Sequence, residues 1–320
     1  MVTKSIAAIA AIAAIGSNSY LDSKNNTNEE MTLGIEKSIL PSVVWIAEHN
    51  GYFEDEGLAL TLIEHDSGRN ALNQMISGNN NLNMVTVAQT PIVFNSFENE
   101  NFQILTSMVS STKDVKLLGL EDSGIKTLQD LRGKKIGITF GSTGHYFLEH
   151  LLSENDLSIS DVEIFDIHAS ELPFTIFEKR VDAIVSWEPH IFQTEKILKE
   201  NYVIFTSDSF VEEFYFVVNN DFKENSSTLK KFFLALYRAE AFIDANPNES
   251  KKIVSDRLRI DYDFVDNVWN DFEFEISLDS SLIHSLDDEA QWAKTLEPYS
   301  QKDIPDFHNF VDYNFLVEFN

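Results

Sequence analysis

From residue 31 onward, short segments in which apolar and polar residues alternate are followed by segments with apolar residues at every third or fourth position. The first pattern predicts β-strands and the second predicts amphipathic helices. The strands expected in the first part of the chain are 31–35, 58–63, 82–87 and 102–109, and the helices between them are 41–49, 69–76 and a short one from residue 90. This order predicts a largely parallel sheet covered by helices.

The same rhythm begins again at residue 115, which predicts a second unit of the same α/β class. Its strands are expected at 115–120, 135–139, 162–165 and 181–186, with a helical turn at 128–131 and helices at 145–153 and 173–178. Strands at 203–206 and 214–218 lead back to the first unit. Residues 228–300 are expected to be mostly helical, most clearly over 229–243, where the helical spacing of apolar residues is strongest.

The chain is therefore expected to cross between the two units twice, near 110–115 and near 206–216. Two crossings make a hinge, and a hinge between two lobes creates a cleft. We expect one lobe from residues 31–112 together with 216–320, and a second lobe from 113–215. A length of 320 residues suits this division, since a domain typically has ~150 residues.

The N-terminus is unlike the rest of the chain. Lys4 precedes an uninterrupted apolar run over 6–15, and Gly16 follows it. A basic residue, a short apolar run and small residues at its end are typical of an export signal, and the run is too short to span a bilayer. We interpret residues 1–16 as a signal segment. The alternatives are an apolar terminal helix and an uncleaved anchor. The polar, unpatterned residues 17–30 are expected to form a tether.

Charge and cysteine content exclude several classes of function. The chain has 52 acidic and 24 basic residues, a net charge of −28, and it has no cysteine. Such an acidic surface repels phosphate backbones and anionic lipids, so the charge disfavours nucleic acid and membrane surfaces as partners, and we expect no nucleic acid partner. The absence of cysteine excludes disulfides, thiolate nucleophiles, cysteine-based zinc sites and iron–sulfur clusters.

Small polar residues recur where predicted strands lead into predicted helices. These residues are Ser38, Ser67 with Gly68, Gln89 with Thr90, and Ser142 with Thr143. Ligands of open α/β sheets bind beyond the carboxyl ends of the strands, and the free N–H groups of a helix start favour an anion. Each of these residues alone could be an ordinary helix cap. Their recurrence in both units favours a ligand site, and Arg69 could add a bidentate contact to an anion.

Metal and hydrolase sites are not indicated. His145 and His150 are five residues apart, which is the wrong spacing for two ligands on one helix face. Ser142 lies near His145, but no G-x-S-x-G motif is present to support a nucleophile. We therefore expect no metal, no cofactor and no catalytic residues.

Trp187 and Glu188 follow directly after the strand expected at 181–186. They could be a core tryptophan beside a surface carboxylate. They could also form an aromatic wall and a carboxylate for the cationic end of a ligand, as their place at a strand end would allow.

Four segments resemble the periplasmic solute-binding proteins of ABC transporters for taurine, alkanesulfonates, nitrate and thiamine-pyrimidine precursors. They are 51–57 (GYFEDEG), 128–137 (LQDLRGKKIG), 141–145 (GSTGH) and 181–189 (VDAIVSWEP), within a resemblance that runs from about 31 to about 293. The chain departs from that family in its acidity. Its lack of cysteine also excludes the lipoprotein branch and the branch of pyrimidine synthases with a cysteine-rich motif.

The resemblance implies a two-lobed periplasmic-binding-protein fold, similar to type II, that closes on one small-molecule ligand and delivers it to an ABC permease. The pocket residues of the family would carry over to Ser38, Ser67, Gly68, Gln89, Thr90, Ser142, Thr143, His145, Trp187 and Glu188. We expect an exported, periplasmic monomer, tethered to the membrane if its N-terminal segment is not cleaved.

The main hypothesis from the sequence is a binding protein for a sulfonate or a taurine-like zwitterion. Helix starts would hold the anionic head and Glu188 the amine, and the net charge of −28 favours a zwitterion over a bare anion. Three alternatives stay open: an aromatic heterocycle such as a thiamine-pyrimidine precursor stacked on Trp187, a sensor that signals to a membrane receptor, and an enzyme on the same fold.

Overall fold

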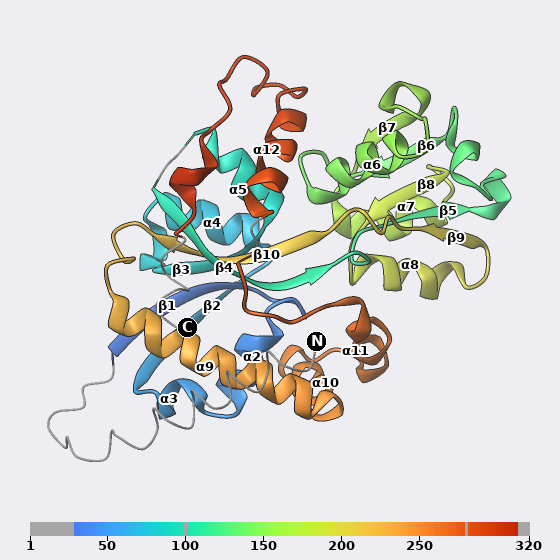
Figure 1. The fold of residues 1–320 in the computed structure, drawn as a ribbon. Helices are drawn as coiled ribbons and strands as arrows, with labels where there is room; N and C mark the ends of the chain where they lie inside the picture. Colours follow the sequence, from blue (N-terminus) through green and yellow to red (C-terminus); the bar gives the residue numbers. More distant parts are fainter. Residues whose placement is uncertain (1–28, 99–100, 279–280, 313–320) are drawn as a thin grey trace, which may run out of the picture.

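Two five-stranded sheets organise the computed structural model, which describes residues 29–98, 101–278 and 281–312. The first has the strand order β2-β1-β3-β10-β4 and the second β7-β6-β8-β5-β9 (Figure 1). The strands of the first sheet are β1 (Glu29–Glu36), β2 (Leu58–His65), β3 (Met84–Ala88), β4 (Phe102–Ser111) and β10 (Glu212–Asn219). Those of the second are β5 (Lys116–Leu120), β6 (Lys135–Ile138), β7 (Glu163–Asp166), β8 (Ala183–Ser186) and β9 (Tyr202–Phe205).

The start of β1 differs from the prediction. The expected signal segment and residues 17–28 lie outside the described residues, but Glu29 and Glu30, which were expected in the tether, belong to β1. Hydrogen bonds from Lys231 (2.8 Å) and Thr228 (2.5 Å) hold the carboxylate of Glu29, and they lower its pKa to about 2. These contacts with residues about 200 positions away fix the strand two residues earlier than its apolar pattern indicates.

Each sheet has four strands that run in the same direction and one reversed strand, so the prediction of a largely parallel sheet missed the reversed strand. β1 runs parallel to β2 and β3, whereas β10 runs antiparallel to β3 and β4. In the second sheet β6 runs parallel to β7 and β8, and β5 runs antiparallel to β8 and β9. The reversed strand of each sheet is the first strand after the chain arrives from the other sheet. Such a strand is not joined to its neighbours by a local crossover helix, so nothing forces it to run parallel to them.

The two crossings between the sheets lie side by side. β4 ends at Ser111 and β5 begins at Lys116, whereas β9 ends at Phe205 and β10 begins at Glu212. Figure 1 shows both crossings as the neighbouring segments that join the two lobes. The predicted two-lobed α/β fold with a two-crossing hinge is therefore confirmed in its architecture.

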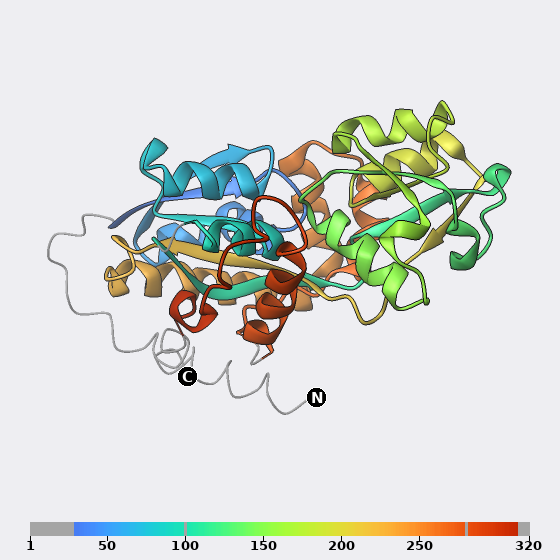
Figure 2. The same ribbon diagram turned by 90° about the horizontal axis from the view of Figure 1, so that it is seen from above.

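Helices cover both faces of each sheet, as seen from above in Figure 2. Those around the first sheet are α2 (Ser42–His49), α3 (Tyr52–Asp55), α4 (Gly68–Ile76), α5 (Gln89–Ser96), α9 (Ser226–Ala245), α10 (Pro247–Leu258), α11 (Tyr262–Val268) and α12 (Leu282–Ala293). Those around the second are α6 (Thr143–Ser153), α7 (Leu172–Phe177) and α8 (His190–Leu198). Among the helices of the described residues, none is long and apolar enough to cross a membrane.

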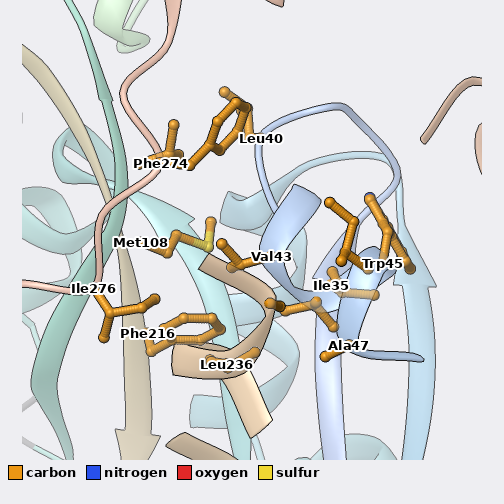
Figure 3. Packing of buried hydrophobic residues seen from close by; sticks show 14 of the residues in the cluster. Ile35, Leu40, Val43, Trp45, Ala47, Met108, Phe216, Leu236, Phe274 and Ile276 are labelled. Carbon is orange, nitrogen blue, oxygen red and sulfur yellow. The ribbon is translucent and has the colours of Figure 1, made fainter. Parts of the chain in front are cut away.

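The core of the first lobe has one cluster on each face of its sheet. Figure 3 shows the larger cluster, which includes Val43 and Trp45 of α2, Leu236 of α9 and Phe216 of β10. All four side chains are fully buried. The opposite face packs against α4, α5 and α12. This burial on both faces fixes the strands, and therefore the loops that leave their ends.

The second lobe is built in the same way on a smaller scale. Phe147 and Leu148 of α6 pack on one face of its sheet, and Leu172 of α7 and Ile191 of α8 pack on the other. The buried apolar residues of this lobe form clusters of their own, and only the half-buried Tyr146 and Phe192 among its described apolar residues also pack against the clusters of the first lobe. Each lobe can therefore keep its own packing while the hinge between them changes.

One part of the region expected to be mostly helical is extended. Phe272, Phe274 and Ile276 point inward and are buried, and this segment runs along the edge of β4. The amide of Ser107 donates to the carbonyl oxygen of Ser277 over 2.7 Å. The alternation of buried and exposed residues in this segment is the period of a strand and not of a helix.

Candidate ligand-binding site

A cavity of about 660 Å³ lies between the two lobes. In the first lobe its walls come from the loops and helix starts that follow β1, β2 and β3. In the second lobe they come from those that follow β6, β7 and β8. These are the carboxyl ends of the parallel strands, where open α/β sheets bind their ligands. Asp114 and Glu212, one at each crossing, also line the cavity.

Eight of the predicted site residues lie at this cavity, and three do not. The predicted residues in its lining are Ser38, Ser67, Gly68, Arg69, Ser142, Thr143, Trp187 and Glu188. Gln89, Thr90 and His145 are absent from it. The strand-to-helix turns of both lobes thus meet in space, although several of their polar groups are already engaged by the protein itself.

The start of α4 is occupied by a carboxylate of the same chain. The amide of Gly68 donates to Oε2 of Glu36 over 2.9 Å, and the Ser67 hydroxyl accepts from the amide of Asn70. Partial withdrawal from water raises the pKa of Glu36 to about 7, and the Gly68 hydrogen bond opposes that rise. A Cβ at Gly68 would meet the backbone of Val87 at 2.7 Å, so this position requires glycine. The predicted anion contact at α4 is therefore already filled by Glu36.

Gln89 and Thr90 contact the protein interior rather than the cavity. Nε2 of Gln89 donates to Oε2 of Glu289 on α12 over 2.9 Å. Gln89, Thr90 and Glu289 are all buried. The Thr90 hydroxyl lies 3.1 Å from that of Thr143, across the two lobes. Their polarity is explained by these contacts, which could not be read from the local pattern.

His145 faces a second cavity, of about 980 Å³, on the other side of the same interface. Its ring stacks on that of Phe140 at 5.0 Å between centroids, and Trp292 of α12 meets it edge-on at 5.3 Å. Burial lowers the pKa of His145, so the ring is neutral at neutral pH. The predicted role of His145 in the ligand pocket does not agree with this placement.

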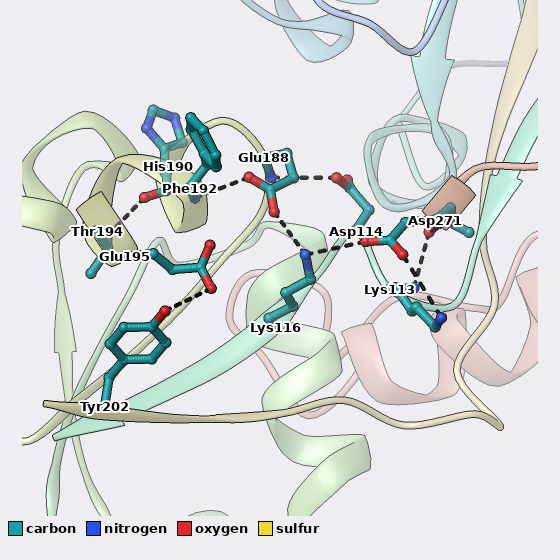
Figure 4. Close-up of polar contacts among 11 residues, drawn as sticks. Lys113, Asp114, Lys116, Glu188, His190, Phe192, Thr194, Glu195, Tyr202 and Asp271 are labelled. Atoms are coloured by element: carbon teal, nitrogen blue, oxygen red, sulfur yellow. Dashed lines mark hydrogen bonds and ion pairs between the residues drawn. The ribbon is translucent and has the colours of Figure 1, made fainter. Parts of the chain in front are cut away.

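Glu188 lies at the cavity, but its charge is taken up by a lysine (Figure 4). Nζ of Lys116 is 2.7 Å from Oε1 of Glu188 and 3.5 Å from Oδ2 of Asp271, and the amide of Phe192 donates to Oε2 of Glu188 over 3.0 Å. Burial lowers the pKa of Lys116, but the neighbouring carboxylates, Glu188 first, raise it above the ordinary value. The sequence-based assignment of Glu188 to the amine of a ligand conflicts with this ion pair, because both carboxylate oxygens already have donors.

Asp114 and Glu212 are acidic residues at the hinge that the sequence analysis did not select. Their exposed fractions are 2% and 5%. Their carboxyl groups share a hydrogen bond, and Oδ1 of Asp114 accepts from the amide of Glu188 over 3.3 Å. Burial, followed by the charge of Glu188, raises the pKa of Asp114 to about 7. Burial also raises the pKa of Glu212 well above its ordinary value.

Arg69 joins the lobes instead of pointing freely at a ligand. Its guanidinium, on α4, donates to the carbonyl oxygen of Gly141 in the loop between β6 and α6. Gly141 has a φ of +65°, which glycine adopts without strain. Burial lowers the pKa of Arg69, which nevertheless stays protonated. Together with the contact between Thr90 and Thr143, this bond joins the two lobes beside the cavity.

Trp187 forms part of the cavity wall, as the sequence suggested. Its ring lies edge-on to that of His190 at 6.0 Å between centroids. Phe214 of β10 lines the same cavity from the other lobe. Among the described residues, no group of three or more His, Cys, Asp or Glu is placed to hold a metal ion.

The acidic residues at the hinge left a weak signal in the sequence. Asp114 and Glu212 both lie in short segments that connect apolar strands of different lobes. A charged residue at such a crossing is expected to be solvated unless another part of the fold covers it. Only the approach of residues 98 positions apart buries the two carboxyls together, and no local pattern indicates that approach.

Relatives of known name resemble large parts of the chain. A putative aliphatic sulfonates-binding protein of Bacillus subtilis is 26% identical over 251 residues, which cover 77% of this chain and 74% of that protein. A putative binding protein of Brucella abortus is 28% identical over 151 residues. That match covers 44% of this chain and 46% of the relative, so it spans about half the length of each.

Solved structures share the fold, and a family model matches most of the chain. The periplasmic aliphatic sulphonate binding protein SsuA from Escherichia coli superposes with a TM-score of 0.77 at 15% identity, over 90% of this chain and 99% of that one. That likeness confirms the expected two-lobed fold. The family model described as NMT1/THI5 like matches residues 42–250. The chain therefore belongs to the NMT1/THI5-like family.

Proposed function

We propose that the protein is an exported solute-binding protein that encloses a small polar ligand between its lobes and presents it to an ABC permease. The observation that carries this proposal is the cavity of about 660 Å³, whose walls come from strand-end loops of both sheets at a two-crossing hinge. A ligand held there contacts both lobes, so its binding favours the closed arrangement. The sulfonate-binding relative and the family membership support the same role.

The ligand that suits this cavity carries charges of both signs, as a taurine-like zwitterion does. Lys37 and Arg69 lie in the lining together with carboxyl groups. The start of α6, at Thr143, also faces the cavity and would favour the anionic end of a ligand. Closure excludes water and strengthens each of these contacts.

A thermal-shift screen tests the proposed role. Sulfonates, nitrate, amino acids and pyrimidines are added one at a time, and the melting temperature is measured. A ligand that binds only the folded protein raises that temperature in proportion to the logarithm of its concentration. Calorimetry then measures the affinity of each compound that stabilises the protein, and recovery of the unchanged compound excludes turnover. If no compound in the screen stabilises the protein at millimolar concentration, the proposed role is contradicted.

An aromatic heterocycle is a second candidate ligand, because Trp187 forms part of the cavity wall. A putative thiamine biosynthesis protein of Haemophilus influenzae is 26% identical over 219 residues, which agrees with such a ligand. Quenching of tryptophan fluorescence by pyrimidines, together with no response to sulfonates, would favour this candidate.

The location and the partner can be tested in cells. The apolar segment at 6–15 is expected to direct export, and the mature protein is expected to act as a monomer beside a permease. Fractionation of cells that express the full chain, with and without residues 1–16, tests export. Gel filtration tests the monomer.

A further inference from the structure

The charges that line the ligand cavity are strongly unbalanced. Its carboxyl groups are those of Glu36, Asp66, Asp114, Glu188 and Glu212, and its basic side chains are those of Lys37 and Arg69. Both basic side chains have partners of their own. Nζ of Lys37 lies 3.1 Å from Oε2 of Glu64, with half of its side chain exposed, and Arg69 is bonded to Gly141. The lining therefore offers a ligand more carboxyl groups than free cations.

Only some of these carboxyl groups have a donor within the protein. Lys116 pairs with Glu188, and the amide of Gly68 donates to Glu36. Glu212 is satisfied at one oxygen only: the Thr143 hydroxyl donates to its carboxyl group, but Oε2 is buried and accepts no hydrogen bond from the described part of the chain. A buried oxygen without a donor is costly, so this side chain is the position where a donor is missing.

The hydrogen bond between Asp114 and Glu212 indicates what that donor is. Two carboxyl groups can hydrogen-bond to each other only if one of them carries a proton. A proton therefore holds the pair together when the cavity has no ligand. An ammonium group offers three N–H donors and a full positive charge, so it can replace that proton and satisfy both carboxylates at once.

We propose that Asp114 and Glu212 bind the ammonium group of the ligand, and that the ligand is a small primary amine or an amine-bearing zwitterion rather than a simple anion. This inference rests on the proposed function. An anion without an amine would meet the acidic lining with no cation to offset it, and Glu36 already fills the helix start of α4.

The position of the pair connects amine binding with lobe closure. Asp114 lies between β4 and β5, and Glu212 begins β10, so the two carboxyl groups belong to the two different crossings. An ammonium group between them holds both crossings in one arrangement. The other groups that act on the pair are the charges of Glu188, Lys116 and Glu289 and the hydroxyl of Thr143.

If the amine displaces a proton, its affinity for the protein depends on pH with a known sign. A primary amine stays protonated at neutral pH, whereas the pair must lose a proton to bind it. The affinity for an amine therefore increases from pH 6 to pH 8, by at most about tenfold per pH unit for one displaced proton. The same displacement releases a proton to the buffer when the amine binds.

Three probes that differ at one end separate the two charges of a ligand: taurine, ethanesulfonate, which lacks the amine, and ethanolamine, which lacks the sulfonate. Calorimetry at pH 7 measures each affinity in two buffers of different ionisation enthalpy, which also counts the protons released. We expect taurine and ethanolamine to bind with proton release and ethanesulfonate to bind at least tenfold more weakly than taurine.

The matched variants are Glu212→Gln and Glu213→Gln. Both remove one carboxylate from β10, but Glu213 is outside the cavity lining, where it accepts a hydrogen bond from Tyr215 over 2.6 Å. Glu212→Gln is expected to weaken taurine and ethanolamine by about ten- to a hundredfold and to abolish the proton release, because a charged hydrogen bond is lost. Glu213→Gln is expected to leave the two affinities and the proton release unchanged. The melting temperature of each variant without ligand confirms that it is folded.

The outcomes distinguish this inference from the proposed function. If taurine and ethanolamine do not bind at millimolar concentration but another compound of the thermal-shift screen stabilises the protein, the assignment of an amine is overturned and the proposed function stands. If ethanesulfonate binds as tightly as taurine, the protein is still a solute-binding protein, but the assignment of an amine is overturned. Equal affinities of the folded Glu212→Gln and Glu213→Gln variants for the two amines would also overturn it.

Discussion

The ammonium nitrogen of Lys116 lies 2.7 Å from Oε1 of Glu188, a residue that lines the ligand cavity. The exposed fractions of the two side chains are only 12% and 2%. Because the side chain of Glu188 is almost fully buried, Lys116 determines whether its carboxylate is neutralised within the fold or left to interact with a ligand.

Lys116→Met should therefore destabilise the protein through the carboxylate that it leaves behind. We expect the free energy of unfolding in urea to fall by about 3 kcal/mol, as when one partner of a buried ion pair is removed. The double variant Lys116→Met with Glu188→Gln should recover a large part of that loss, since no unpaired charge remains. Additive losses in the double variant would show that the two side chains do not act as a pair.

The bond between Arg69 and Gly141 leads to a prediction about closure. Arg69→Met removes a contact between the lobes but keeps most of the apolar side chain. We expect the ligand-free protein to have a larger radius of gyration in small-angle X-ray scattering and a lower ligand affinity. Arg132→Met is the control, because Arg132 pairs with Asp161 within the second lobe. If both variants scatter alike, the contact of Arg69 does not hold the lobes together.

The buried carboxyl groups predict how stability depends on pH. Burial raises the pKa values of Glu240 and Glu289 from the ordinary value of 4.5 to about 7. Because the folded protein binds these protons more tightly than the unfolded chain, the stability they contribute is complete below pH 4.5 and is lost as the pH rises through 7. The melting temperature should therefore rise as the pH is lowered from 7.5 to 5.

A variant isolates that effect from the relief of general charge repulsion, which has the same sign in so acidic a chain. Glu289→Gln keeps a hydrogen-bonding side chain beside Gln89 but cannot titrate. Its melting temperature should change less between pH 5 and 7.5 than that of the unaltered protein. A surface change such as Glu121→Gln should leave that pH dependence as it was, and identical curves for all three proteins would contradict the role of Glu289.

Tryptophan fluorescence should report on the ligand cavity through one residue. Trp187 lines the cavity, whereas Trp45, Trp269 and Trp292 are buried elsewhere. Trp187→Phe is expected to remove most of the emission change caused by a bound ligand, and Trp269→Phe is expected to keep it. A full response from Trp187→Phe would instead place the signal at Trp292, which contacts α6 across the lobes.

Much of the fold could be predicted from the sequence because its signals are local. The alternation over 58–63 and 102–109 falls within β2 and β4, and the helical pattern at 145–153 lies within α6. Strand direction could not be predicted in the same way. The reversal of β5 and β10 follows from the path of the whole chain between the sheets, and the pattern within a strand is the same in either direction.

The sequence allowed the location of the candidate site to be predicted, but not the contacts between its side chains. The turns at Ser67 and Ser142 could be assigned to one cavity because both follow parallel strands. The pairing of Lys116 with Glu188, 72 residues apart, could not be predicted, because either residue alone resembles an ordinary surface charge. The same holds for Asp114 and Glu212, whose burial depends on the two crossings coming together.

The place of β10 in the first sheet has a consequence for the order in which the chain can fold during synthesis. β10 lies between β3 and β4, yet it is made about a hundred residues after them. Until Glu212–Asn219 has left the ribosome, β4 has no neighbour in its own sheet and β3 keeps one edge unpaired. The second lobe, one uninterrupted segment between these strands, is complete earlier. A nascent chain that stops before residue 212 would therefore carry one finished lobe and two open strand edges, which are sites for chaperones and for aggregation.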